Sequence, residues 1–251
     1  MTDKRRTLEI CVETLADVRA AMEGGADRVE LCGALALGGL TPSAGLAASA
    51  MALVRESGAI LRAMVRPRDG DFTYDDDDLA LAEAEGRALI TQDVDGLVFG
   101  AVRDDRLDGP ALCRWVDAMR REKADIGLTL HRAVDLVADP VAAVEDAVAI
   151  GFDHVLTSGG AVLAIDALPV IAAMERQAAG RITIMPGSGI RSTNVAAIVQ
   201  QTAVRAAHAS ARRDSHPADP RALAMGFALG PRRQGNREEI AALRRELDRL
   251  A

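Results

Sequence analysis

Short apolar segments alternate with longer alanine-rich segments along the whole chain. The longer segments, such as DPVAAVEDAVAIG (139–151), place apolar residues near positions i, i+3, i+4 and i+7, as amphipathic helices do. Several of them begin with a residue that favours a helix N-cap, namely Thr14, Ser43, Asp139 and Ser192. The short segments are typical of buried strands; they are LEICV (8–12), RVELC (28–32), ILRAMVRP (60–67), GLVFGA (96–101), GLTLHRA (127–133), HVLTSG (154–159), RITIMPG (181–187) and AVRAAHAS (203–210).

This order of elements predicts an α/β protein with a parallel sheet, because strands that alternate with helices form βαβ units. Eight such units in 251 residues match a single-domain TIM (β/α)8 barrel. An open doubly wound sheet is the alternative, but no G-x-G-x-x-G motif follows the first strand. A short repeat supports the count of strands, since an aspartate precedes the second, fourth and sixth of them: Asp27, Asp95 and Asp153.

The pattern divides the chain into three parts. Residues 1–211 form the predicted barrel core. Residues 212–235 contain Pro217, Pro220 and Pro231 and lose the periodicity, so we expect a long loop after the eighth strand. Residues 236–251 have the pattern of an amphipathic helix, which we expect to pack on the barrel.

Polar residues gather where the predicted strands end. In LTLHRAVD (128–135) an apolar run stops at His131, Arg132 and Asp135, and the same change occurs after most of the other strands. In a TIM barrel these ends meet on the face that carries the active site, so we expect a site there. Its candidate residues are Glu9, Cys11, Glu30, Cys32, Arg66, Arg68, Asp71, His131, Arg132, Asp135 and His208.

Each candidate also has a purely structural interpretation. Glu9 and Glu30 inside apolar strands are costly unless they are paired, and a buried ion pair with Arg66 or Arg132 would satisfy them. His131 is either a functional histidine or a core histidine with satisfied hydrogen bonds. His208 occupies a similar position with fewer charged neighbours in sequence.

Two glycine-rich loops follow the sixth and seventh strands. Exposed backbone N–H groups before a helix form an anion site, and TIM barrels often bind phosphate in this region. We therefore expect an anion at these loops, although tight turns that need positive φ would use the same residues. The residues concerned are Ser158, Gly159, Gly160, Gly187, Ser188 and Gly189.

Composition narrows the class of protein. The net charge of −7 and the aromatic content of 2% disfavour a nucleic-acid partner. No apolar stretch reaches the roughly 18 residues of a membrane span, and Glu9 and Glu13 interrupt the N-terminal segment where a signal peptide would be apolar. Three cysteines fit a reducing cytoplasm. No nucleotide cofactor is indicated, and a homo-oligomer is left open.

Cys11 and Cys32 occupy matching places on sequential strands, which are about 4.8 Å apart in a sheet. Two thiolates at that separation could hold a soft ion such as Cu(I), with His131 or a methionine nearby. Two inert buried cysteines are the structural alternative.

With these motifs in place, residues 7–211 resemble the CutC family, named for copper homeostasis. The resemblance rests on LEICVETLADVRAAMEGGADRVELC, GGLTPSAGL, VRPRDGDFTY, LVFGAV, LHRAVD, VLTSGG, MPGSGI and HASA, in that order. It implies a TIM barrel, a cytoplasmic location and a role in copper handling. It also implies Cu(I) binding, with Cys11 and Cys32 at the family's cysteine positions.

The chain departs from the family pattern at three places. Leu37 stands where an acidic residue is common, Asp69 replaces a glycine of the arginine loop, and Ala206 and Ala207 lie where a glutamate often precedes the histidine. The many carboxylates, arginines and glycines also suggest another function, an enzyme of lyase or isomerase type that acts on a small phosphorylated or carboxylated metabolite. There the arginines and glycine amides would bind the anion, and His131 with Glu30 would transfer a proton. The sequence leaves open whether the protein is an enzyme.

Overall fold

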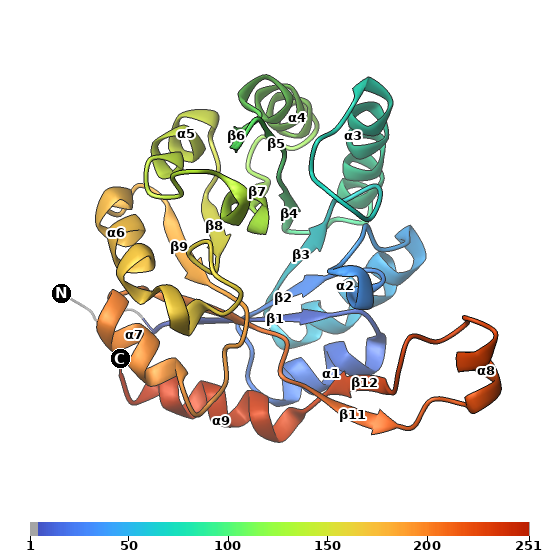
Figure 1. Ribbon diagram of the computed structural model, residues 1–251. Coiled ribbons are helices and arrows are strands. Elements are labelled where there is room, and N and C mark those ends of the chain that lie inside the picture. Colours follow the sequence, from blue (N-terminus) through green and yellow to red (C-terminus); the bar gives the residue numbers. More distant parts are fainter. Residues whose placement is uncertain (1–4, 251) are drawn as a thin grey trace.

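Eight parallel strands form a nearly closed barrel in the computed structural model, which describes residues 5–250 (Figure 1). Their hydrogen-bonded order is β10-β1-β2-β3-β4-β7-β8-β9, and β9 lies beside β10 where the barrel closes. The predicted TIM barrel is confirmed. The strands are β1 (Thr7–Val12), β2 (Arg28–Leu31), β3 (Ile60–Met64), β4 (Gly96–Phe99), β7 (Gly127–Leu130), β8 (His154–Thr157), β9 (Thr183–Pro186) and β10 (Ala206–Ala209).

Helices surround the sheet and connect its strands. None of the helices within residues 5–250 is both long and apolar enough to cross a lipid bilayer. They are α1 (Leu15–Glu23), α2 (Ala44–Ser57), α3 (Asp76–Ile90), α4 (Gly109–Glu122), α5 (Ala143–Ile150), α6 (Leu168–Ala178), α7 (Val195–Thr202), α8 (Pro220–Ala224) and α9 (Arg237–Asp248). Shorter elements are η1 (Leu35–Leu37), η2 (Arg132–Leu136), η3 (Ala164–Ala167), β5 (Val102–Arg103) and β6 (Arg106–Leu107).

The predicted N-caps have different outcomes. Thr14 and Ser43 cap α1 and α2 as expected. Asp139 accepts hydrogen bonds in the turn before α5. The prediction for Ser192 is wrong, because α7 begins after Asn194, and Ser192 instead donates to the carboxylate of Glu239 on α9.

The apolar core lies between the sheet and the helices, while the inside of the barrel is partly charged. Along β1 the side chains alternate, so that Leu8 and Ile10 join the outer core and Glu9 turns the other way. On β4, Phe99 stacks on Trp115 of α4 with ring centroids 4.5 Å apart. This alternation brings polar groups into the barrel on a scaffold of buried strands.

The repeated aspartates fasten neighbouring strands at their amino-terminal ends. Each accepts a hydrogen bond from a backbone N–H of the preceding strand: Asp27 from Leu8 at 2.8 Å, Asp95 from Leu61 at 2.7 Å and Asp153 from Leu128 at 2.7 Å. The repeat therefore has a structural cause, since the same junction recurs at every second strand.

Residues 212–235 form an arm rather than the uninterrupted loop that the sequence predicts. Strand β11 (Arg212–His216) pairs antiparallel with β12 (Arg232–Gly235), and α8 lies between them (Figure 1). Figure 1 shows this C-terminal arm projecting from the barrel beside α1. The last helix, α9, packs against α1 and α7, and Ile240 lies so close to Gly24 that a Cβ there would be 2.5 Å from it. The predicted boundaries at residues 1 and 251 lie outside the described residues.

Candidate functional site

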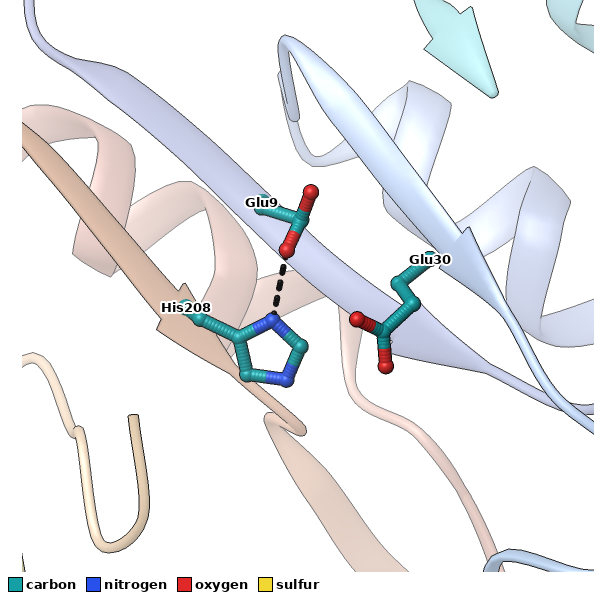
Figure 2. Close-up of side chains that lie close together, drawn as sticks. All are labelled: Glu9, Glu30 and His208. Atoms are coloured by element: carbon teal, nitrogen blue, oxygen red, sulfur yellow. Dashed lines mark hydrogen bonds and ion pairs between the residues drawn. The ribbon is translucent and has the colours of Figure 1, made fainter. Parts of the chain in front are cut away.

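A charged cluster occupies the inside of the barrel where β1 lies between β2 and β10. In the strand register, Glu9 is opposite Arg28 on one side and His208 on the other. Arg28 Nε donates to Oε2 of Glu9, and Nδ1 of His208 lies 2.7 Å from Oε1 (Figure 2). Glu9 is therefore paired, as the structural interpretation requires, but with Arg28 and His208 rather than with Arg66 or Arg132.

Burial and neighbouring charges set the protonation of this cluster. Burial opposes ionisation of Glu9, but Arg28 and the hydrogen bond from His208 bring its pKa well below the ordinary value. Burial raises the pKa of Glu30. Burial alone would lower the pKa of His208, yet the charge of Glu30, the nearby Cys11 and the hydrogen bond to Glu9 raise it well above the ordinary value. The cluster therefore favours a positive charge on the His208 ring.

The side chain of Arg62 extends across the inside of the barrel, from β3 to β7. It donates to Thr129 on β7, and burial lowers its pKa to about 10. Room for its side chain comes from two glycines on adjacent strands, since a Cβ on Gly96 would lie 3.0 Å from Arg62 Cγ and one on Gly127 would lie 2.9 Å from its guanidinium. Arg28 continues this layer by donating to Nε2 of His154 at 3.1 Å.

The two cysteines lie at the edge of the same cluster. Cys11 is opposite Glu30 in the register of β1 and β2, and Cys32 follows β2, with its backbone N–H donating to Val12. The buried thiol of Cys32 donates to Oε1 of Glu30 at 3.4 Å, and burial, Glu30 and Cys11 raise its pKa. Cys11 is half-buried. Glu30 thus lies next to both cysteines, and its carboxylate also lies close to Glu9 and His208.

His131 lies elsewhere in the barrel. Strands β3 and β4 separate β7 from β2, so the structure does not bring His131 to Glu30, and His208 takes that place. Nδ1 of His131 accepts from the N–H of Ala133 at 3.1 Å, which leaves the proton on Nε2, a buried atom without a partner among residues 5–250. Burial, together with Arg66, lowers its pKa to about 3, so the ring is neutral.

The two arginines that follow β3, Arg66 and Arg68, hold loops in place. The guanidinium of Arg66 donates to the backbone carbonyls of Leu37 at 2.8 Å, Gly39 at 3.2 Å and Gly70 at 2.8 Å. Arg68 forms salt bridges with Asp71 at 3.2 Å and Asp78 at 2.9 Å. Their roles in binding a ligand stay predictions.

The loop after β8 already surrounds an anionic group of the protein itself. Oδ1 of Asp135 accepts from the hydroxyl of Thr157 at 2.6 Å and from the N–H groups of Ser158 and Gly160 at 2.9 and 3.2 Å. Oδ2 accepts from Arg132 at 2.8 Å. Gly159 and Gly160 both have positive φ. Of the donors that the sequence assigns to an external anion at this loop, the N–H groups of Ser158 and Gly160 are thus satisfied by Asp135, and that of Gly159 by the hydroxyl of Thr157.

The loop after β9 is tightly packed. A Cβ on Gly187 would lie 2.6 Å from Leu156, and Ser188 and Gly189 adopt φ of 76° and 73°. The hydroxyl of Ser188 donates to the carbonyl of Val162 at 2.7 Å, which ties this loop to the one after β8. Gly187 therefore allows close packing and Gly189 allows the positive φ of the turn. The binding of an anion at this loop stays a prediction.

Sequence reasoning missed Arg28, Arg62 and His154. A signal for Arg28 exists, because it stands two residues before Glu30 in a short apolar strand and therefore faces the same way. Arg62 is likewise a lone charge within an apolar run. Arg28 and His154 begin their strands and Arg62 lies in the middle of β3, so a search confined to the carboxyl ends of strands passes over them.

Comparison with known proteins points to one family. The family model described as the CutC family matches residues 6–213. A family protein CutC from Sinorhizobium medicae is 43% identical over 98% of each chain, and one from Caulobacter vibrioides is 43% identical over 96% of each. A crystal structure provisionally described as a copper homeostasis protein CutC from Streptococcus agalactiae has a TM-score of 0.77 and 31% identity, covering 82% of this chain and 98% of that one.

Proposed function

The chain belongs to the CutC family, and on that premise we propose that it serves copper homeostasis by binding Cu(I) through the thiols of Cys11 and Cys32. The observation that supports this most directly is the place of two free cysteines at the carboxyl ends of adjacent strands, with Cys11 opposite Glu30 in the register and the thiol of Cys32 donating to the same carboxylate. Their reduced state fits a cytoplasmic location.

The chemistry of the donors suits Cu(I) better than a hard cation. Thiolates and thioethers are soft ligands that select Cu(I), and Met64 packs against Cys32 in a small cluster inside the barrel. Among the carboxylates that a hard ion would need, Glu9 has both oxygens engaged, by Arg28 and His208. Binding to Cys32 displaces its proton, and Oε1 of Glu30 is the acceptor already in contact with the thiol.

The enzyme alternative has less support from the geometry. Asp135 occupies the amides expected to bind an anion, and His131 and Glu30, expected to transfer a proton together, lie on separated strands. A metabolite site at the carboxyl face stays a prediction.

Anaerobic titration of the protein against a chromophoric Cu(I) chelator tests the proposal. We expect stoichiometric binding by the wild type, and a loss of affinity of roughly 10- to 100-fold or more in Cys11→Ser and in Cys32→Ser. Cys113→Ser is the matched control, because that cysteine is free but exposed on α4, and it should bind as the wild type does. Wild-type affinity in a Cys11→Ser/Cys32→Ser variant would refute the site.

A further inference from the structure

The tip of the C-terminal arm is an apolar segment between arginines. Residues 223–230, with the sequence LAMGFALG, contain no charged residue, and Arg221 precedes them while Arg232 follows closely. The large side chains of this segment point into solvent, with exposed fractions of 43%, 65%, 79% and 78% for Leu223, Met225, Phe227 and Leu229. Phe227 is the one exposed aromatic residue within residues 5–250. Exposed apolar groups that lie together usually mark a binding surface.

The barrel does not cover this tip. Figure 1 shows the arm projecting away from the strands and helices of the barrel. A cavity of about 700 Å³ lies between them, with Leu35 and Leu37 of η1 on the barrel side and Phe227 and Leu229 on the arm side. The apolar side chains of the tip are therefore available to a partner outside the chain.

Charge is unevenly divided between the arm and the rest of the chain. Residues 212–235 contain five arginines and two aspartates, which gives a net charge of +3. Subtracting this from the −7 of the whole chain leaves −10 for the other residues. A negatively charged surface therefore attracts the arm and repels the barrel, which orients the molecule with its arm forward.

Three arginines of the arm are free to contact an anionic group. Arg213, Arg221 and Arg232 are exposed, and their side chains form no salt bridge within residues 5–250. Both aspartates of the arm have other partners, since Asp214 pairs with a neighbouring arginine at 3.6 Å and Asp219 accepts from the backbone N–H of Arg221 at 2.7 Å. Guanidinium groups bind phosphate oxygens through paired N–H donors.

The backbone of the tip also suits an interface with lipid. The N–H of Gly226 donates to the carbonyl of Leu223 at 3.0 Å. The N–H groups of Phe227 and Ala228 donate to the carbonyl of Ala222 at 2.8 and 3.3 Å. Unpaired backbone donors are costly where water is scarce. The turn can therefore approach acyl chains without leaving these donors unsatisfied.

From these features we infer that the C-terminal arm binds the surface of membranes that contain anionic phospholipids. Phe227 and Leu229 enter the boundary between headgroups and acyl chains, and the exposed arginines contact the phosphates. This binding goes beyond the proposed role in copper homeostasis and does not depend on it.

Charge and shape both favour a bilayer over a protein partner. A symmetric dimer joined through the arms would bring two segments of net charge +3 together, which disfavours a second copy of the chain. A protein of another kind would need a concave surface matched to the projecting tip, whereas a fluid bilayer accommodates the tip without one.

Co-sedimentation of the full-length protein with vesicles, in the absence of copper, tests the inference. We expect binding to vesicles of phosphatidylcholine and phosphatidylglycerol in equal parts, and little binding to vesicles of phosphatidylcholine alone. Phe227→Ala/Leu229→Ala should weaken the binding about tenfold or more. The matched control is Leu81→Ala/Val162→Ala, which removes exposed apolar side chains outside the arm and should bind as the wild type does.

The role of charge is tested in the same assay. Arg221→Gln/Arg232→Gln should weaken the binding about fivefold for each arginine removed, and added salt should weaken the binding of the wild type. Arg121→Gln/Arg245→Gln changes the net charge equally but replaces exposed arginines of α4 and α9, so it should bind as the wild type does.

Entry of the tip into the bilayer is measured with Phe227→Trp. The chain has one other tryptophan, Trp115, which is fully buried. A shift of the emission towards shorter wavelength on addition of anionic vesicles therefore reports on position 227, and we expect that shift.

Wild-type protein that stays in the supernatant with anionic vesicles would overturn the inference. Equal binding to neutral vesicles, or equal losses in the arm variants and their controls, would overturn it too. A dimer that Phe227→Ala/Leu229→Ala dissociates, measured by analytical ultracentrifugation, would assign the tip to a second copy of the chain instead.

Discussion

Three histidines inside or near the barrel differ in charge because their neighbours differ. Within residues 5–250, His131 and His154 have no hydrogen bond to a carboxylate, and burial together with Arg66 or Arg62 lowers the pKa of each to about 3. His208 is as well buried, but Glu9 and Glu30 beside it raise its pKa. The sequence could predict buried histidines at strand positions, but not their charge, which depends on the residue across the barrel.

Stability should therefore rise with pH below the ordinary pKa of histidine. Between pH 3 and 6.5 the unfolded chain binds protons at His131 and His154 that the folded chain does not, so each contributes about 1.4 kcal/mol per pH unit to the free energy of unfolding. Urea unfolding at about pH 5.0 and about pH 6.5, both within this window, measures the slope. His131→Gln should flatten it, whereas His216→Gln on the exposed arm should not. Equal slopes in wild type and His131→Gln would contradict the buried neutral ring.

At the scale of elements, the alternation of side chains made most of the site predictable. It placed Glu9 with Cys11 and Glu30 with Cys32 on shared faces, and the strands begin and end within a few residues of the predicted segments. The pairing of Glu9 with His208 could not be predicted, because β10 reaches β1 only through closure of the barrel and the register between them. A spacing within one strand carries no information about that register.

The glycines at the start of β4 and β7 should resist substitution because they make room for Arg62. A Cβ on Gly96 would lie 2.6 Å from the carbonyl oxygen of Gly127, so Gly96→Ala should destabilise the protein by about 1–3 kcal/mol. Gly45→Ala is the control, since nothing lies within 4 Å of a Cβ at that position of α2, and it should stabilise by about 0.5–1 kcal/mol. Denaturant unfolding compares the two variants. An unchanged free energy of unfolding in Gly96→Ala would show that the interior of the barrel can accommodate the added methyl group.

For the whole molecule, the part that matches the family model is the barrel, and most of the C-terminal arm lies beyond it. The family model ends at residue 213, and the Streptococcus agalactiae structure covers only 82% of this chain. The arm exposes Phe227 and Leu229 by 79% and 78%, so it buries little surface. The sequence predicted a break in periodicity there but not the paired strands, because β11 and β12 are held mainly by backbone hydrogen bonds rather than by an apolar pattern.

Shortening the arm should therefore leave the barrel intact. Replacement of residues 217–231 by an Asn-Gly turn would join β11 to β12 directly, and we expect the free energy of unfolding to change by no more than about 0.5 kcal/mol. Ile240→Ala on α9 should instead cost about 2–5 kcal/mol, since this side chain is fully buried. Chemical unfolding of both variants tests the contrast; a large loss on shortening the arm would mean that it supports the barrel.

Anomalous diffraction at the copper absorption edge, from crystals of the Cu(I)-loaded protein, locates the metal without reference to any variant. The account predicts a single strong peak at the carboxyl ends of β1 and β2, between the sulfurs of Cys11 and Cys32. A peak at exposed Cys113, or copper scattered over the surface with none at the barrel mouth, would contradict it.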